Sequence, residues 1–185
     1  MISNDKIDSA INHIRTLMAD SNGAKIYIGH SGGKDSCAIV KLVELSGYDL
    51  PLVHTVKPWG TLNGTHPDTI TFLYNLMSNH LGYMVPFDDF GMFLESEEWL
   101  WQIDGTRRDE AERHSRSTDI RIDGEVVCRS AMTSPIINDG VFGVNVLCPM
   151  YDWSEEEVWS FLRDYSVEIS PEYDTLDINS INKYS

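Results

Sequence analysis

Residues 25 to 36 run Lys25-Ile26-Tyr27-Ile28-Gly29-His30-Ser31-Gly32-Gly33-Lys34-Asp35-Ser36. The apolar start, Lys25 to Gly29, predicts a short strand, and Ser31 to Asp35 predicts a turn. Apolar residues then recur at helical spacing up to Leu45, before Gly47 closes that helix. Glycines without a Cβ let backbone N–H groups approach phosphate oxygens, and a following helix adds free donors and the positive end of its dipole. The segment therefore predicts a phosphate-binding loop.

The polar side chains of this loop suit an anion, with one exception. Lys34 supplies a point charge, and Ser31 and Ser36 supply hydroxyl donors. Asp35 is unusual beside an anion, and two roles remain open for it: it orients the loop, or it helps to hold a Mg²⁺ that the ligand brings. The spacing is neither that of a Walker loop nor Gly-x-Gly-x-x-Gly. A plain glycine turn before a capped helix is the structural alternative.

Helices and strands alternate along the chain, which predicts an α/β fold. We expect a mostly parallel, twisted, Rossmann-like sheet with helices on both faces. Asp-Gly at 123–124 predicts a hairpin, Ser154 and Glu157 form a capping box, and Asp68 is expected to cap the helix that follows it. Further helices are expected over 5–20, 68–81 and from 154, and further strands over 51–55, 83–86, 100–104 and 144–147.

The length of 185 residues fits a single domain with its own core. We expect this domain to span residues 1–173. Periodicity weakens after Tyr165, so residues 174–185 are expected to form a tail that is disordered or swapped between copies.

Composition disfavours several classes of partner. The net charge is −15, from 14 basic and 29 acidic residues, and such a surface repels nucleic-acid and lipid phosphates. No apolar stretch is long enough to span a bilayer, and the first residues lack a signal-peptide pattern. The three cysteines form no CxxC pair, so we expect reduced thiols in a cytoplasmic protein and no zinc or iron–sulfur site.

The hexapeptide Ser31 to Ser36 resembles the PP-loop, Ser-Gly-Gly-x-Asp-Ser, of the ATP pyrophosphatases and adenine-nucleotide α-hydrolases. The resemblance implies that all six residues bind an adenine nucleotide. In that group the loop holds the phosphates while a nucleophile attacks the α-phosphorus. Pyrophosphate leaves, and an adenylylated substrate forms.

Three further segments narrow the resemblance to the phosphoadenylyl-sulfate (PAPS) reductase family. Gly105-Thr106-Arg107-Arg108-Asp109-Glu110 with Arg113 resembles Gly-x-Arg-x-x-Glu-Ser-x-x-Arg of that family. Residues 148–159 resemble its Pro-x-x-Asp-Trp-Ser-x-x-x-Val-Trp segment, and residues 61–69 resemble Asn-Thr-Gly-x-x-x-Pro-Glu-Thr. The matches follow the expected order over residues 25–174. They imply nucleotide contacts by Gly105, Arg107, Arg108, Glu110 and Arg113, and catalytic roles for Lys34, Asp35, Arg107 and Arg108.

The arginine segment supports an anion site on its own chemistry. Arg107, Arg108, Arg113 and Arg116 concentrate four of the 14 basic residues in one stretch. One guanidinium group can bind two oxygens of a phosphate or sulfate at once, and carboxylates nearby can hold the arginines in place. A solvated loop with surface ion pairs is the alternative. We expect Trp153 and Trp159 to pack in the core, Asp152 to brace the last helix, and His54 and His66 to be structural.

The departures from the family pattern concern the chemistry. Reductases of this family attack sulfur with a cysteine near the C-terminus, and this chain has no cysteine after Cys148. The loop is intact, as in members that cleave ATP. We therefore expect an ATP pyrophosphatase or adenylyltransferase-type enzyme with ATP (or PAPS) and Mg²⁺ as cofactors, and no iron–sulfur cluster.

Two other functions stay open. One is a PAPS reductase in which Cys128 or Cys148 is the nucleophile, and the other is a non-catalytic nucleotide-binding or regulatory module. The partner beside the nucleotide is expected to be an anionic second substrate, and a homodimer is a further possibility that the resemblance raises.

Overall fold

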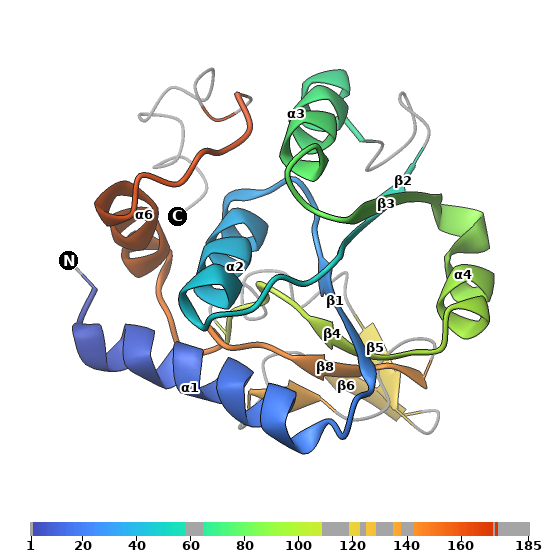
Figure 1. Ribbon diagram of the computed structural model, residues 1–185, viewed down its shortest axis with the longest axis horizontal. Helices are drawn as coiled ribbons and strands as arrows, with labels where there is room; N and C mark the ends of the chain where they lie inside the picture. Colours follow the sequence, from blue (N-terminus) through green and yellow to red (C-terminus); the bar gives the residue numbers. More distant parts are fainter. Residues whose placement is uncertain are drawn as a thin grey trace.

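The computed structural model describes residues 2–57, 65–108, 119–122, 125–128, 135–137, 143–171 and 173 (Figure 1). The described helices are α1 (Asn4–Asp20), α2 (Lys34–Leu45), α3 (Pro67–Met77), the 3₁₀ turn η1 (Phe87–Asp89), α4 (Phe90–Ser96) and α6 (Glu155–Asp164). The described strands are β1 (Lys25–Gly29), β2 (Leu52–Val56), β3 (Gly82–Pro86), β4 (Trp99–Ile103), β5 (Asp119–Ile122), β6 (Glu125–Cys128), β7 (Ile136–Ile137) and β8 (Asn145–Leu147).

One sheet organises the fold, in the order β3-β2-β1-β4-β8-β7. Its first five strands are parallel, and the two-residue strand β7 adds to β8 in antiparallel direction. Because β1 lies in the middle of the order, the residues that follow it reach the centre of the sheet's carboxyl edge. In doubly wound sheets this is where ligands bind.

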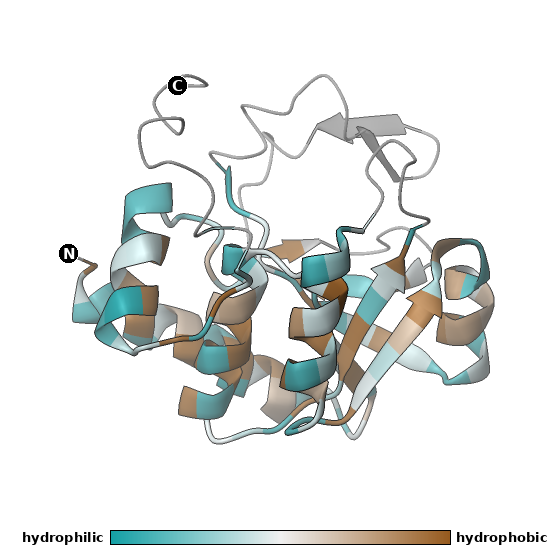
Figure 2. Ribbon diagram, turned by 90° about the horizontal axis from the view of Figure 1, so that it is seen from above, coloured by the Kyte–Doolittle hydropathy of each residue, from teal (hydrophilic) through white to brown (hydrophobic). Residues whose placement is uncertain are grey.

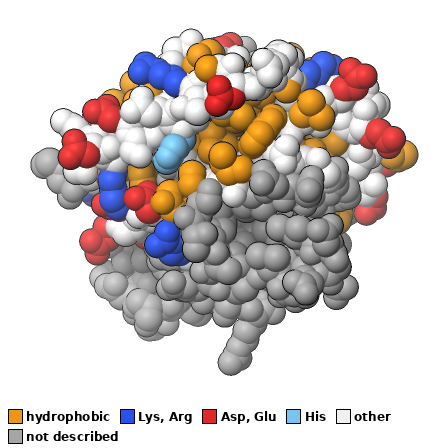
Figure 3. Space-filling model, turned by 90° about the horizontal axis from the view of Figure 1, so that it is seen from below, with side chains coloured by type: hydrophobic (Ala, Val, Ile, Leu, Met, Phe, Trp, Pro, Cys, Tyr) orange, Lys and Arg blue, Asp and Glu red, His pale blue; other side chains and the backbone are white. Residues whose placement is uncertain are grey.

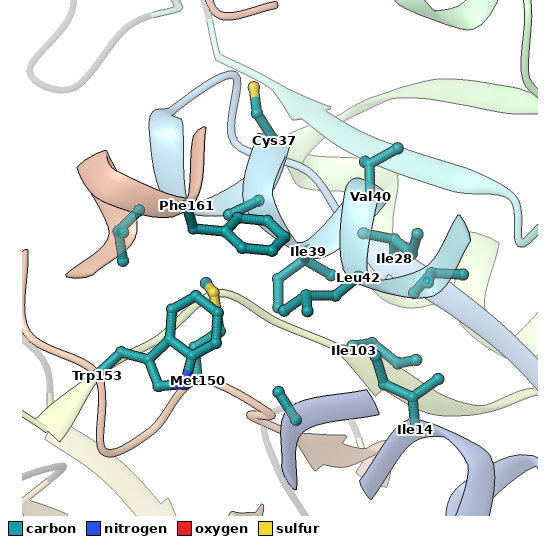
Figure 4. Close-up of a cluster of buried hydrophobic side chains, with 14 of the residues drawn as sticks. Ile14, Ile28, Cys37, Ile39, Val40, Leu42, Ile103, Met150, Trp153 and Phe161 are labelled. Atoms are coloured by element: carbon teal, nitrogen blue, oxygen red, sulfur yellow. The ribbon is translucent and has the colours of Figure 1, made fainter. Parts of the chain in front are cut away.

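Alternation along the strands gives the sheet two apolar faces. On one face Ile28 and Ile103 pack under side chains of α1, α2 and α6, including Ile14, Leu42 and Phe161 (Figure 4). On the other face Tyr27, Val53, Val85, Trp99 and Val144 pack with Leu94 of α4. Apolar strands therefore lie between layers of helices (Figure 2), and the predicted α/β fold with helices on both faces is confirmed.

The surface is mixed in character. Seen from below, hydrophobic side chains gather over the middle of the described surface, with acidic and basic groups around them (Figure 3). At the amino edge of the sheet a groove of about 1050 Å³ lies between α4 and the starts of β1 and β4, and Met92, Leu94, Trp99 and Leu100 are among its walls. This groove is separate from the loop after β1, which lies at the opposite, carboxyl edge of the sheet.

Most predicted elements are present with shifts of one or two residues at their ends. The predicted hairpin is confirmed in its strands, since β5 and β6 pair antiparallel, and its Asp-Gly turn at 123–124 lies outside the described residues. The capping box is complete: the Ser154 hydroxyl accepts from the Glu157 N–H at 3.3 Å, and the Glu157 carboxylate accepts from the Ser154 N–H at 2.8 Å. Trp153 is buried in the core, as expected. The expected tail, residues 174–185, lies outside the described residues.

One helix start and one helix end were predicted wrongly. His66, not Asp68, caps α3, and its Nδ1 accepts a hydrogen bond from the Asp68 N–H at 3.1 Å. Pro67 explains the difference, because proline favours the first helical position and so places the cap one residue before itself. The helix ends at Met77, so Leu81 lies beyond it and is exposed.

Candidate functional site

The predicted phosphate loop leaves β1 at Gly29 and enters α2 at Lys34. Gly32 has φ +90°, and a Cβ there would collide with Thr69 of α3. Glycine is therefore required at this position both by the backbone angle and by the close approach of α3. Gly33 is the N-cap of α2 and offers no side chain to the first turn, so the helix start is left to other acceptors.

The two loop serines bond to each other. The Ser31 and Ser36 hydroxyl oxygens lie 2.9 Å apart, and the Ser31 N–H donates to the Ser36 Oγ at 3.1 Å. The Gly33 N–H donates to the Ser31 Oγ at 3.2 Å. These contacts hold the loop in its curve, so the serines stabilise the loop in addition to any ligand contact.

A buried histidine, His30, holds the backbone of the loop through a hydrogen bond. It was not among the predicted site residues. His30 is 2% exposed, and its Nδ1 accepts a hydrogen bond from the Gly32 N–H at 3.0 Å. Burial, with the nearby charges of His54 and His80, lowers the pKa of His30 to about 3. His54 lies within 2.7 Å of the His30 carbonyl oxygen through its own Nδ1, and burial lowers its pKa too. His54 therefore has the structural role that was expected.

Lys34 stands at the centre of a charged cluster. Its Nζ lies 2.9 Å from Asp35 Oδ2 and 3.7 Å from Glu155 Oε1, and it sits 6.0 Å above the Trp159 ring. Burial alone would lower the pKa of Lys34, but the Asp35 charge and hydrogen bond and the Glu155 charge raise it above its ordinary value. The lysine is therefore a cation at neutral pH, held at the start of α2.

Arg107 contacts the second oxygen of the Asp35 carboxylate, Oδ1, whereas Lys34 contacts Oδ2. Arg107 is 1% exposed, and its Nε donates to Asp35 Oδ1 at 2.7 Å. Gly105 permits this approach, since a Cβ there would lie 2.9 Å from the Asp35 carbonyl carbon. The structure thus brings together two predicted segments that lie 72 residues apart. Arg107 is thus buried against Asp35, and its predicted contact with a nucleotide or anion stays a prediction.

Of the other predicted contacts in the arginine segment, the structure describes Arg108. Arg108 is exposed, its guanidinium lies 5.2 Å from the Tyr151 ring, and its N–H donates to the Tyr151 carbonyl at 2.8 Å. It joins the arginine segment to the segment that begins at Cys148. The predicted contacts Glu110 and Arg113 lie outside the described residues.

A cleft of about 360 Å³ opens beside the loop on the α4 face of the sheet. A chain of hydrogen bonds forms part of its wall: the Tyr27 hydroxyl donates to Gln102 Oε1 at 2.8 Å, and Gln102 Nε2 donates to Asp104 Oδ2 at 2.8 Å. Val53 and Phe90 add apolar walls. The described residues that line it include two carboxylates, Asp35 and Asp104, and no lysine or arginine. The cleft therefore offers no cation to a phosphate and suits the uncharged part of a ligand.

Two roles were open for Asp35, orienting the loop or helping to hold a Mg²⁺, and its neighbours favour the first. One carboxylate oxygen accepts from Arg107 and the other from Lys34. A Mg²⁺ bound directly to it would lie next to two cations. Within the described ranges, no group of three His, Cys, Asp or Glu side chains is arranged to hold a metal ion. The geometry fits an Asp35 that orients the loop.

The two described thiols are enclosed. Neither Cys37 nor Cys148 forms a disulfide with a described residue, and both are buried. Burial, together with the Asp35 charge, raises the pKa of Cys37 to about 12. A nucleophilic cysteine needs exposure and a thiolate near neutral pH, and neither residue meets both needs.

Comparison with solved structures gives the same architecture. A PAPS reductase from Candida auris, solved as a phosphate complex, is similar over 94% of this chain and 92% of its own, with a TM-score of 0.58 and 11% identity. An NH3-dependent NAD synthetase from Campylobacter jejuni matches over 91% and 75% with a TM-score of 0.60 and 10% identity. An NMN synthetase from Francisella tularensis matches over 91% and 73% with a TM-score of 0.57 and 12% identity.

These three structures belong to the PP-loop adenine nucleotide α-hydrolase superfamily, so the fold that the resemblance implied is confirmed. At such identities the likeness concerns the fold alone. No family model and no curated protein matches the sequence. Across the part of the chain that the structure describes, no helix combines the length and the hydropathy that a membrane span requires.

Proposed function

We propose that this protein is a PP-loop enzyme of the PAPS reductase type that binds ATP and cleaves it between the α and β phosphates. One observation carries the proposal: the loop from Ser31 to Ser36 carries a cationic group, Lys34, and also borders a cleft of about 360 Å³ whose described walls hold no lysine or arginine. A nucleotide has the same division into a charged and an uncharged part. The phosphates would lie at Lys34, and the nucleoside would enter the cleft.

The residues take distinct roles in this reaction. Lys34 and the backbone N–H groups at the start of α2 stabilise the charge that grows on the leaving pyrophosphate. Asp35 orients Lys34, and Arg107 holds Asp35 from behind. Mg²⁺ arrives with the nucleotide as part of the substrate. Catalysis then rests on positioning and electrostatics.

The second substrate attacks the α-phosphorus, and the bond from that phosphorus to the bridging oxygen breaks. We propose an anion for this substrate. Arg108 is the exposed arginine of the described segment, and the family resemblance adds Gly105, Glu110 and Arg113. The bond chemistry is adenylyl transfer, which gives an adenylylated product and free pyrophosphate.

ATP suits this site better than PAPS does. Reduction of a sulfonucleotide needs a cysteine thiolate to attack sulfur. Cys148 is fully buried, and Cys37 is buried with a raised pKa. Both described thiols therefore lack the exposure that such an attack requires, and the side chain of Cys128, the other candidate nucleophile, lies outside the described residues.

The wider setting follows from composition and periodicity. We propose a cytoplasmic protein whose single nucleotide-binding domain spans residues 1–173, followed by the tail 174–185. Its net charge of −15 disfavours nucleic acid and lipid surfaces as partners. A homodimer is compatible with the proposal, and gel filtration measures it.

The test is an assay of the purified protein with α-labelled ATP, Mg²⁺ and a panel of small anions such as sulfate, phosphate monoesters and carboxylates. We expect pyrophosphate to appear together with AMP or an adenylylated anion. If calorimetry shows no ATP binding and no pyrophosphate forms with any anion, the proposal is wrong. Tight ATP binding without turnover would instead support a regulatory module, and sulfite release from PAPS with reduced thioredoxin would support a reductase.

A further inference from the structure

Tyr173 reaches the phosphate loop from the segment that follows α6. The Lys34 backbone N–H donates to its hydroxyl oxygen at 3.1 Å, across 139 residues of sequence. A Cβ on Gly33 would lie 3.2 Å from the same oxygen. The phenol oxygen is therefore seated against both residues at the turn into α2.

The tyrosine ring is held in place by the last helix. It meets the Trp159 ring edge-on, with centroids 5.7 Å apart and planes at 79°. Trp159 also lies under the Lys34 ammonium, and Glu155 of the same helix lies 3.7 Å from that ammonium. The main-chain N–H and the side chain of Lys34 thus both contact residues from α6 and the segment after it.

The contact between the Lys34 N–H and the Tyr173 hydroxyl lies at the first N–H groups of helix α2. They have no partner inside the helix, and they form the natural binding site for a phosphate oxygen. The N–H of Lys34 is the first of α2, and Gly33 gives it no side-chain cap. A phenol oxygen within hydrogen-bond distance of this donor takes the place of a phosphate oxygen.

We propose that Tyr173 competes with the nucleotide for the loop. Its hydroxyl oxygen and a phosphate oxygen use the same Lys34 N–H, so binding of one displaces the other. The contact lowers the affinity of the loop for phosphates and couples nucleotide binding to movement of the chain after α6. This inference rests on the proposed function, because it requires that the loop bind phosphate.

The substitution Tyr173→Phe removes the competing oxygen and keeps the ring on Trp159. A neutral hydrogen bond contributes about 0.5 to 1.5 kcal/mol, so we expect pyrophosphate with Mg²⁺, measured by titration calorimetry, to bind about 2- to 10-fold more tightly to the variant. The matched control is Tyr165→Phe, since Tyr165 packs on Phe161 in the same part of the chain. We expect no change in its affinity.

Each outcome decides the inference. Equal or weaker binding of pyrophosphate by Tyr173→Phe overturns it, and weaker binding would make the hydroxyl a ligand of the phosphate. A wild-type protein that binds neither pyrophosphate nor ATP defeats the proposed function itself, which separates the two failures. A second measurement uses the wild-type protein alone. The NMR chemical shifts of the Tyr173 ring protons should change when pyrophosphate is added. If pyrophosphate binds and these chemical shifts stay the same, displacement of Tyr173 is contradicted.

Discussion

The loop from Ser31 to Ser36 has different surroundings on the two faces of the sheet. On the face of α2 and α6, Lys34 is enclosed by Asp35, Glu155 and Trp159. On the α4 face, the cleft is bordered by the Tyr27–Gln102–Asp104 hydrogen-bond chain and apolar side chains. The loop therefore carries a cation, Lys34, on one face and borders a pocket without a described lysine or arginine on the other. In the proposed function, this difference sets the direction in which the nucleotide binds.

The largest expected effect comes from breaking the ion pair that supports the charged side. Asp35→Asn removes the carboxylate that accepts from the buried Arg107 Nε at 2.7 Å, which is one of the contacts of this guanidinium, and losing one partner of a buried pair costs about 3 to 5 kcal/mol. We expect the free energy of unfolding in urea to fall by roughly this amount. Asp49→Asn, at an exposed carboxylate, is the control and should change stability little. A stable Asp35→Asn protein would show that Arg107 does not depend on this carboxylate.

The next effect concerns ligand affinity. Lys34→Ala removes the cation and should weaken ATP binding about 10- to 100-fold, since a hydrogen bond to a charged group contributes about 1.5 to 3 kcal/mol. Calorimetry measures the affinity. Lys41→Ala changes a lysine of the same helix that pairs with Glu44, and it should leave the affinity unchanged. Equal affinities of the two variants would remove Lys34 from the site.

The third effect is a dependence of stability on pH. The pKa of His30 is about 3 in the folded protein against an ordinary 6.5, so the unfolded chain takes up the proton first. The contribution of His30 is fully present above pH 6.5 and is lost as pH falls toward 3, by at most about 1.4 kcal/mol per pH unit.

The variant His30→Asn isolates this contribution. An asparagine carbonyl can accept the Gly32 N–H as the His30 ring does, but it does not titrate. Unfolding in urea at a series of pH values should therefore show a flatter acid limb in the variant than in the wild type. Parallel limbs would contradict a buried, neutral His30.

The smallest effect belongs to the start of α6. Ser154→Ala removes the side chain that caps this helix, at a cost of about 1 kcal/mol. Because α6 supplies Glu155 and Trp159, the change acts on the charged side of the loop. Ser9→Ala, at an exposed position within α1, should cause no loss in a urea titration. A similar loss in both variants would show that the cap makes no special contribution.

Local patterns were sufficient for most of the fold. Apolar periodicity and glycine positions located α1, β1, α2 and α6 within a few residues. The strand β7 has two residues, and α4 has seven with a glycine in its first turn. Neither is long enough to produce a periodic signal, so neither was predicted. The N-cap of α3 was missed because histidine is an uncommon capping residue.

The site was only partly predictable because its contacts are long-range. The loop residues could be found from their own order, but the buried bond between Asp35 and Arg107 joins positions 72 residues apart. A charged arginine in a mixed-charge segment suggests a surface group, and nothing in its spacing indicates burial. His30 carries a local signal, since it lies between the strand and the glycine turn, yet its role depends on the Gly32 N–H pointing at its ring.

The most direct test of the division at the loop is a single calorimetric series. Wild-type protein, Lys34→Ala and Gln102→Leu are each titrated with pyrophosphate plus Mg²⁺ and with adenosine. Pyrophosphate should bind the wild type and Gln102→Leu alike but bind Lys34→Ala weakly, whereas adenosine should lose affinity for Gln102→Leu alone. Loss of pyrophosphate binding in Gln102→Leu, or unchanged pyrophosphate binding in Lys34→Ala, would contradict a nucleotide that lies across the loop with its phosphates at Lys34.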